Sequence, residues 1–248
     1  AFKIQGKLNE KELQTAFQTV IDRHESLRTT FFYDEEADAL QQIIHSSTDL
    51  GLGLTVEDYR NGEVSTAAVE EQLEKLSGAV MDLELGPLMK SVLFLLPNDR
   101  AYLFNMTHHI ISDGWSNEIF IQEVLSLYRA SLAGKEHPLT PLTIQFKDYV
   151  DWKETQQLTE AHRVAKDFWL ETFTDGAPVL EVPADFKRPL FQTYQGADVK
   201  LALSEKNTQA FKSLCTENGA TLFMGLLAGL NVLMNRYTKQ EEDGRAHV

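Results

Sequence analysis

The residues best suited to chemistry lie together in the stretch "MTHHIISDGWS", residues 106–116. It holds two adjacent histidines, His108 and His109, and an aspartate, Asp113, four residues after the second histidine. Histidine is the usual general base near neutral pH, and its ring needs a partner that sets its tautomer and orientation. The stretch is therefore either an active site, with Asp113 as a candidate partner, or a buried hydrogen-bonding cluster at the end of a strand.

The geometry of a strand disfavours a metal shared by the two histidines. Successive side chains of a strand point to opposite faces, so His108 and His109 cannot face one pocket if the preceding strand runs through them. No cysteine or glutamate cluster offers a third ligand. We expect one histidine to face a cavity and the other the core. Gly114 would allow a sharp turn and a close approach by substrate, and Ser116 is a candidate helix cap.

Periodic apolar residues predict the elements that must hold this stretch in place. Asn9 is expected to cap a helix whose Leu13, Phe17, Val20 and Ile21 share one face. A nearly continuous apolar run at 87–97 is typical of a central strand buried on both faces. The expected strands are 2–8, 28–33, 41–47, 53–59, 87–97 and 100–109, and the expected helices are 9–28, 65–81, 116–132, 145–155 and 160–173.

The pattern changes after residue 174. Residues 175–195 contain several prolines without helical periodicity, which is typical of a linker. A strand at 197–204, a helix beginning at Ser204 and a strongly apolar helix at 220–238 are expected to follow. One strand and two helices cannot bury that apolar helix, so we expect an unfinished second unit and an exposed apolar patch. Because the chain opens as if a strand were already in progress, we also expect it to be a fragment.

Composition excludes some classes of function. The net charge is −14, from 23 basic and 37 acidic residues among 248, whereas nucleic-acid binders usually present a basic face. The single cysteine, Cys215, permits no disulfide within the chain and is expected to be a small core residue. No apolar run approaches the length of a membrane span. These features predict a cytoplasmic protein that binds neither nucleic acid nor membrane.

Four stretches together resemble the condensation domains of nonribosomal peptide synthetases, in the superfamily shaped like chloramphenicol acetyltransferase. "HHIISDGWS" matches the family's core motif, His-His-x-x-x-Asp-Gly, at every fixed position. "RHESLRTTF" (23–31) resembles its Arg-His-Glu-x-Leu-Arg-Thr-x-Phe motif, and "IQFKDYVDW" (144–152) its Tyr-x-Asp-Tyr-x-x-Trp motif, with Phe146 in place of tyrosine. "DFKRPLFQTYQGA" resembles the proline-rich entry to the second lobe. The "ISDGWS" ending is most similar to domains that join two L-amino-acid units.

The resemblance implies an α/β fold, an α+β two-layer sandwich of the chloramphenicol acetyltransferase type. The family has two similar lobes in a V, with a substrate tunnel between them. On this pattern 1–174 would be the N-terminal lobe, 175–195 the inter-lobe linker and 196–248 the incomplete start of the C-terminal lobe. The family's opening motif and the later parts of the second lobe are missing, so we expect these residues alone to turn over poorly or not at all.

The implied activity is peptide bond formation by an acyltransferase-type enzyme. The amine of an acceptor aminoacyl thioester would attack the carbonyl of a donor thioester, with each substrate carried on a phosphopantetheine arm. The implied partners are the donor and acceptor peptidyl carrier proteins and a neighbouring adenylation domain of the same megaenzyme. The domain itself would bind no metal and no other cofactor.

The resemblance also assigns roles to residues. His109 would accept the proton of the amine or hold the amine in line, and His108 would support the loop. Asp113 would pair with an arginine, with Arg28 as the first choice and Arg23 as the second, because a buried carboxylate needs such a partner. The residues expected to line the tunnel are Gly114, Trp115 and Ser116, and those expected only to pack are Tyr149 and Trp152.

Three other interpretations stay open. Epimerisation domains share the fold and motif but usually continue in a "DGVSW" type of ending. Small-molecule O-acyltransferases share His-x-x-x-Asp, usually without the histidine doublet. A degenerate, non-catalytic domain that only docks a carrier protein would keep the fold without the chemistry.

Overall fold

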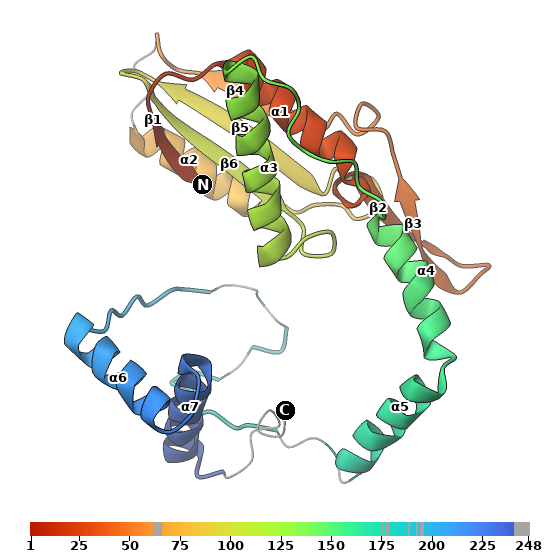
Figure 1. Ribbon diagram of the computed structural model, residues 1–248, viewed down its shortest axis with the longest axis vertical. Coiled ribbons are helices and arrows are strands. Elements are labelled where there is room, and N and C mark those ends of the chain that lie inside the picture. The colour runs from red at the N-terminus through yellow and green to blue at the C-terminus, as the bar shows by residue number, and fades with distance from the viewer. Residues whose placement is uncertain are drawn as a thin grey trace. The chain divides into compact units, whose positions relative to one another are not determined.

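The computed structural model of the chain describes residues 1–61, 66–174, 176, 179–187, 189–191, 193 and 196–240 (Figure 1). The chain divides into two compact units, residues 1–158 and 159–248. The helix expected at 160–173 therefore falls in the second unit, and part of the expected linker lies outside the described residues. The assignment of lobes to 1–174 and 196–248 stays a prediction.

The first unit is built on a four-stranded sheet and a separate hairpin. Strand order in the sheet is β1-β6-β5-β4, with β1–β6 and β6–β5 antiparallel and β5–β4 parallel. The bounds in the sheet are β1 Phe2–Gln5, β4 Leu54–Asp58, β5 Met89–Leu96 and β6 Arg100–Thr107, and the hairpin is β2 Thr29–Asp34 paired with β3 Ala39–Ile44. The sequence predicts all six strands, with bounds that differ by a few residues.

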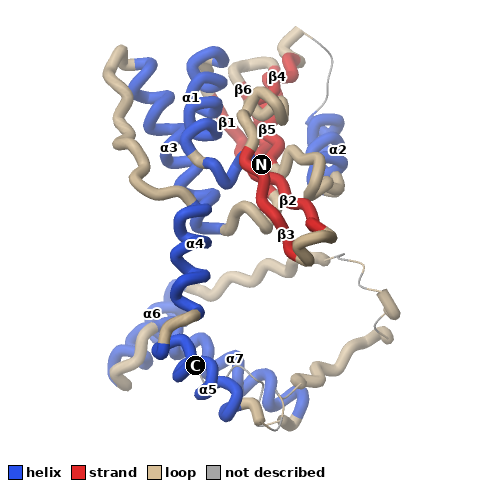
Figure 2. The backbone as a smooth tube through the Cα atoms, turned by 90° about the vertical axis from the view of Figure 1, so that its right-hand side faces the viewer, coloured by secondary structure: helices blue, strands red, loops and turns tan. Residues whose placement is uncertain are grey.

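Helices cover both faces of the sheet, as Figure 2 shows for the strands between α1 and α3 on one side and α2 on the other. The first unit contains α1 Glu10–Arg23, a short 3-10 helix η1 Glu25–Arg28, α2 Thr66–Ser77, α3 Gly114–Leu132 and α4 Phe146–Gln157. The expected start of α2, Ser65, lies outside the described residues. Asn9 caps α1 as predicted, by accepting a hydrogen bond from the backbone N–H of Glu12 at 3.2 Å.

The core lies on both faces of β5, which is why its sequence is almost continuously apolar. Leu93 and Leu95 face the cluster under α1 and α3, whereas Phe94 and Leu96 face the cluster under α2. The four predicted apolar residues of α1 are all buried. One of them, Phe17, meets Phe120 of α3 edge-to-face, with ring centroids 5.4 Å apart. The two helices are therefore joined through their apolar faces.

The second unit contains α5 Glu160–Thr172, α6 Glu205–Glu217 and α7 Leu222–Thr238. Helix α6 starts one residue after the predicted Ser204, which is its N-cap, and Cys215 is buried. Most apolar residues of α7 are exposed as expected, including Phe223 at 72%. The strand expected at 197–204 is wrong: 197–203 have no regular structure, because no described strand of this unit offers a hydrogen-bonding partner. Within the described residues no helix is long and apolar enough to cross a membrane.

Truncation of Phe17 to alanine tests the contact between α1 and the core. The side chain has no exposed surface, so its loss leaves a cavity and should lower the free energy of unfolding of the first unit by about 3–5 kcal/mol. Urea unfolding measures the change. Leu40→Ala, at a position 60% exposed on β3, is the matched control and should stay within about 0.5 kcal/mol. Equal losses for the two variants would contradict this packing.

Candidate active site

The histidine doublet lies in the loop that joins β6 to α3. The ladder of β5 and β6 ends with Met89 opposite Thr107, and the backbone N–H of His108 adds one last hydrogen bond, to the carbonyl of Leu88 at 2.8 Å. The chain then turns, with the N–H of Ile111 bonded to the carbonyl of His108 at 3.1 Å. The expected strand through residue 109 is therefore two residues too long, and the doublet starts where the strand stops.

Residues on the inner side of this loop hold it in place. Ile111 is buried in the core cluster under α1 and α3. The hydroxyl of Ser112 donates to the hydroxyl of Thr107 at 2.7 Å, and that hydroxyl donates to the side chain of Asn117 on α3 at 3.2 Å. The loop is thus anchored to the strand before it and to the helix after it, and its outer residues need no contacts of their own to keep their place.

The two histidines have different surroundings. His108 is half-buried, and its Nδ1 accepts a hydrogen bond from the N–H of Ile110 at 3.1 Å, so a neutral ring carries its proton on Nε2. His109 is exposed and lines a cavity of about 270 Å³. The role in loop support expected for His108 fits this geometry. No group of three or more His, Cys, Asp or Glu side chains in the described ranges is arranged to hold a metal.

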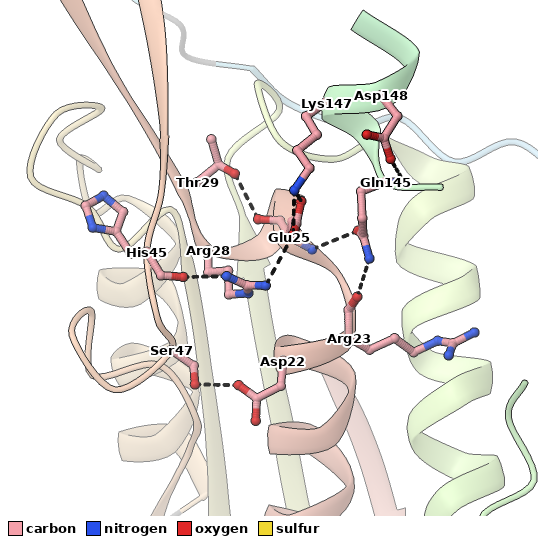
Figure 3. Close-up of polar contacts among 10 residues, drawn as sticks. All are labelled: Asp22, Arg23, Glu25, Arg28, Thr29, His45, Ser47, Gln145, Lys147 and Asp148. Carbon is pink, nitrogen blue, oxygen red and sulfur yellow. Dashed lines mark hydrogen bonds and ion pairs between the residues drawn. The ribbon is translucent and has the colours of Figure 1, made fainter. Parts of the chain in front are cut away.

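Five segments form the cavity, one of them the first turn of α3, through Ser116. The β6–α3 loop contributes residues 109–113, η1 contributes Glu25 and Ser26, the hairpin contributes Phe31 and Ile44, and the start of α4 contributes Phe146 and Lys147. Its volume approaches the range of small ligand sites, and its walls combine apolar side chains with a few polar groups, as such sites do. Figure 3 shows the polar residues where η1 meets the start of α4.

Asp113 is the N-cap of α3. Its carboxylate accepts hydrogen bonds from the backbone N–H of Ser116 at 2.7 Å and from the hydroxyl of Ser116 at 2.6 Å. These bonds, with a smaller contribution from the neighbouring His109, hold the pKa of Asp113 below its ordinary value. The expectation that Ser116 caps the helix is wrong, because α3 begins at Gly114 and Ser116 donates to the cap instead of acting as one.

The expected pairing of Asp113 with an arginine is not formed in the structure. Arg28 donates to the backbone carbonyl of His45 at 2.6 Å and lies 3.9 Å from a carboxylate oxygen of Glu25. Arg23 pairs with Glu123 of α3 at 3.2 Å. Asp113 is exposed, so it does not need the arginine that a buried carboxylate would require, and Ser116 supplies its hydrogen bonds. Arg28 supports the wall of the cavity through Glu25, and Arg23 joins α1 to α3.

The three residues expected to line the tunnel differ in position. Ser116 borders the cavity, whereas Gly114 and Trp115 are not among its lining residues. Trp115 is 77% exposed. Gly114 starts α3, and its φ is outside the left-handed region, so the backbone there does not require glycine; a Cβ would meet no described atom within 4 Å. The space beside Gly114 leaves room for a close approach by substrate.

Sequence reasoning missed two charged residues of the cavity, Glu25 and Lys147. Both lie in stretches that carry the family resemblance, yet they are 122 positions apart and no local pattern relates them. Tyr149 and Trp152, on the same helix as Lys147, were expected only to pack. Their side chains are 45% and 54% exposed, so they do not pack into the core. Their rings form a ladder with Phe146 along α4, with centroids 5.9 and 5.7 Å apart.

Curated proteins similar to this chain are large peptide synthetases. Gramicidin S synthase 2 of Brevibacillus brevis is 34% identical over 242 residues, which are 96% of this chain and 5% of that synthase. Malpibaldin synthetase of Mortierella alpina is 35% identical over 243 residues, which are 97% of this chain and 4% of that synthetase. The chain therefore spans a small part of the length of these relatives.

Solved structures support the α/β fold of the chloramphenicol acetyltransferase type. The epimerization domain from the third module of tyrocidine synthetase B has a TM-score of 0.80 at 22% identity, over 96% of this chain and 52% of that one. The match spans about half of the solved chain, and at this identity it shows the fold alone. A family model described as "Condensation domain" matches residues 1–243. This chain belongs to the condensation domain family of nonribosomal peptide synthetases.

Proposed function

We propose that this domain forms an amide bond between a donor acyl or peptidyl thioester and the amine of an acceptor aminoacyl thioester. The observation that carries the proposal is the position of His109, which lines a cavity from a loop anchored by Ile111 and Ser112. Membership of the condensation domain family and likeness to peptide synthetases support the same reaction.

The reaction needs little from the protein beyond position and one proton acceptor. The neutral amine attacks the donor carbonyl carbon, a C–N bond forms and the C–S bond breaks. The proton lost by the amine ends on the released thiolate of the carrier arm. The imidazole of His109 can accept that proton or hold the amine in line, and either role lowers the barrier. The substrates would arrive on phosphopantetheine arms of donor and acceptor carrier proteins, with an adenylation domain as neighbour.

Epimerisation is the second candidate, because epimerisation domains share this fold and the histidine motif. The histidine motif ends in "DGWS", and this ending favours condensation of two L-amino-acid units instead. A histidine in the same position could remove the α-proton of a carrier-bound aminoacyl group, so the two reactions differ in their products. A loaded donor carrier alone would return an inverted stereocentre in one case and remain unchanged in the other.

Replacement of His109 by alanine should lower amide formation by more than about a hundredfold, within the range that loss of a general base produces. The assay uses the natural polypeptide that contains this sequence, with loaded donor and acceptor carrier proteins and intact-mass detection of the product. His162→Ala, at an exposed position on α5, is the control and should leave the rate unchanged. Equal rates for His109→Ala and the unaltered protein would make His109 structural.

The cap at Asp113 gives the protein an acid-sensitive contribution to stability. Because its pKa is lowered by folding, the carboxylate favours the folded state fully above the ordinary value of 3.8, and this contribution is lost as pH falls through the folded pKa. Asp113→Asn keeps a capping oxygen but removes the charge. Thermal melting should show Asp113→Asn less stable than the unaltered protein at neutral pH, with a difference that shrinks as the pH is lowered below 3.8. A difference that stays constant with pH would contradict this.

A further inference from the structure

The polar residues that join η1 to the start of α4 form a connected set, here called the Glu25 cluster: Glu25, Arg28, Gln145 and Lys147 (Figure 3). Lys147 Nζ lies 2.9 and 2.8 Å from the two carboxylate oxygens of Glu25. Arg28 approaches the same carboxylate and also donates to the carbonyl of His45, just after β3. Glu25 thus lies between two cations, Arg28 on its own 3-10 helix and Lys147 on α4.

Gln145 adds a second connection between the same segments. Its side-chain oxygen accepts a hydrogen bond from the backbone N–H of Glu25 at 3.2 Å, and its side-chain nitrogen donates to the carbonyl of Arg23 at 2.9 Å. Its own backbone N–H donates to the carboxylate of Asp148 at 2.7 Å. One side chain therefore bonds both to the end of α1 and to the start of η1, directly before the first turn of α4.

Helix α4 has no buried residue in the structure, so apolar packing does not fix its position. Its aromatic residues contact one another instead of the core. The side chain of Glu25 is only 19% exposed, and that of Lys147 is 50% exposed. A carboxylate with so little exposed surface needs its cationic partners. The cluster is therefore sensitive to removal of the charge of Glu25 or of Lys147. The first turn of α4 is held by polar contacts, and it carries Phe146 and Lys147 into the cavity.

We infer that Glu25, Gln145 and Lys147 are positioning residues that hold the first turn of α4 against η1 and so set the width of the cavity that His109 faces. This inference rests on the proposed function, because the cavity is taken to receive the acceptor substrate. None of the three needs to touch the reacting atoms. These residues affect how well a substrate is held beside His109. Their replacement should therefore change KM more than kcat.

Hydrogen exchange of the chain tests the contact without any assay of activity. Glu25→Gln and Lys147→Met should each speed amide exchange across 145–157 by about fivefold, the size expected for a partly exposed ion pair. Lys153→Met removes the same charge from an exposed position on the same helix and should leave exchange unchanged. Exchange in Lys147→Met that equals that in Lys153→Met would overturn the inference.

Steady-state kinetics test the consequence for the substrate in the natural polypeptide that contains this sequence. Lys147→Met should raise KM for the loaded acceptor carrier about fivefold with a smaller change in kcat, and Lys147→Arg should restore most of it. If product formation still depends on His109 but Lys147→Met leaves KM unchanged, this inference is overturned and the proposed function is not. Absence of any amide product from the unaltered protein would instead contradict the proposed function, and the exchange result would still decide whether the cluster holds α4.

Discussion

The ladder of hydrogen bonds between β5 and β6 decides where the rest of the site can lie. Because β5 is buried on both faces, a slip of one residue would move Leu93 and Phe94 to the wrong sides of the sheet. The register is therefore fixed, and so is the residue at which pairing stops. His108 makes the last bond of the ladder, and Asp113 caps the next helix, so the loop between strand and helix cannot change its length without disturbing one or the other.

Within that loop, anchoring and exposure are divided between neighbouring residues. Ile111 enters the core and Ser112 bonds back to Thr107, while His109 remains open to the cavity. A histidine held by the backbone rather than by a network of its own keeps both ring nitrogens available for chemistry. The two histidines of the doublet therefore differ in their contacts: the ring of His108 accepts a hydrogen bond within the turn, whereas His109 lines the cavity.

The elements could be predicted from sequence wherever one local signal decided them. Asn9 and the apolar face of α1 are of this kind, and so is the continuous apolar run of β5. Asp113 carried a helix-capping signal that the sequence analysis gave to Ser116 instead, because Asp113 was considered only as a partner in the active site. The strand expected at 197–204 failed for lack of a partner, and the approach of Lys147 to Glu25 has no local signal at all.

The β2–β3 hairpin is a two-stranded sheet of its own, with no ladder to the four-stranded sheet. It nevertheless supplies Phe31 and Ile44 to the cavity, whereas the loop of His109 is attached to the large sheet. Two-stranded ribbons bend and tolerate substitution more readily than sheets packed on both faces. Phe31 ties one end of the ribbon to the core cluster that also holds Ile111 of the histidine loop, whereas Tyr33, Leu40 and Ile43 are exposed. Under the proposed function, the exposed part of the ribbon is therefore where the cavity could change shape for a new substrate without moving the loop of His109.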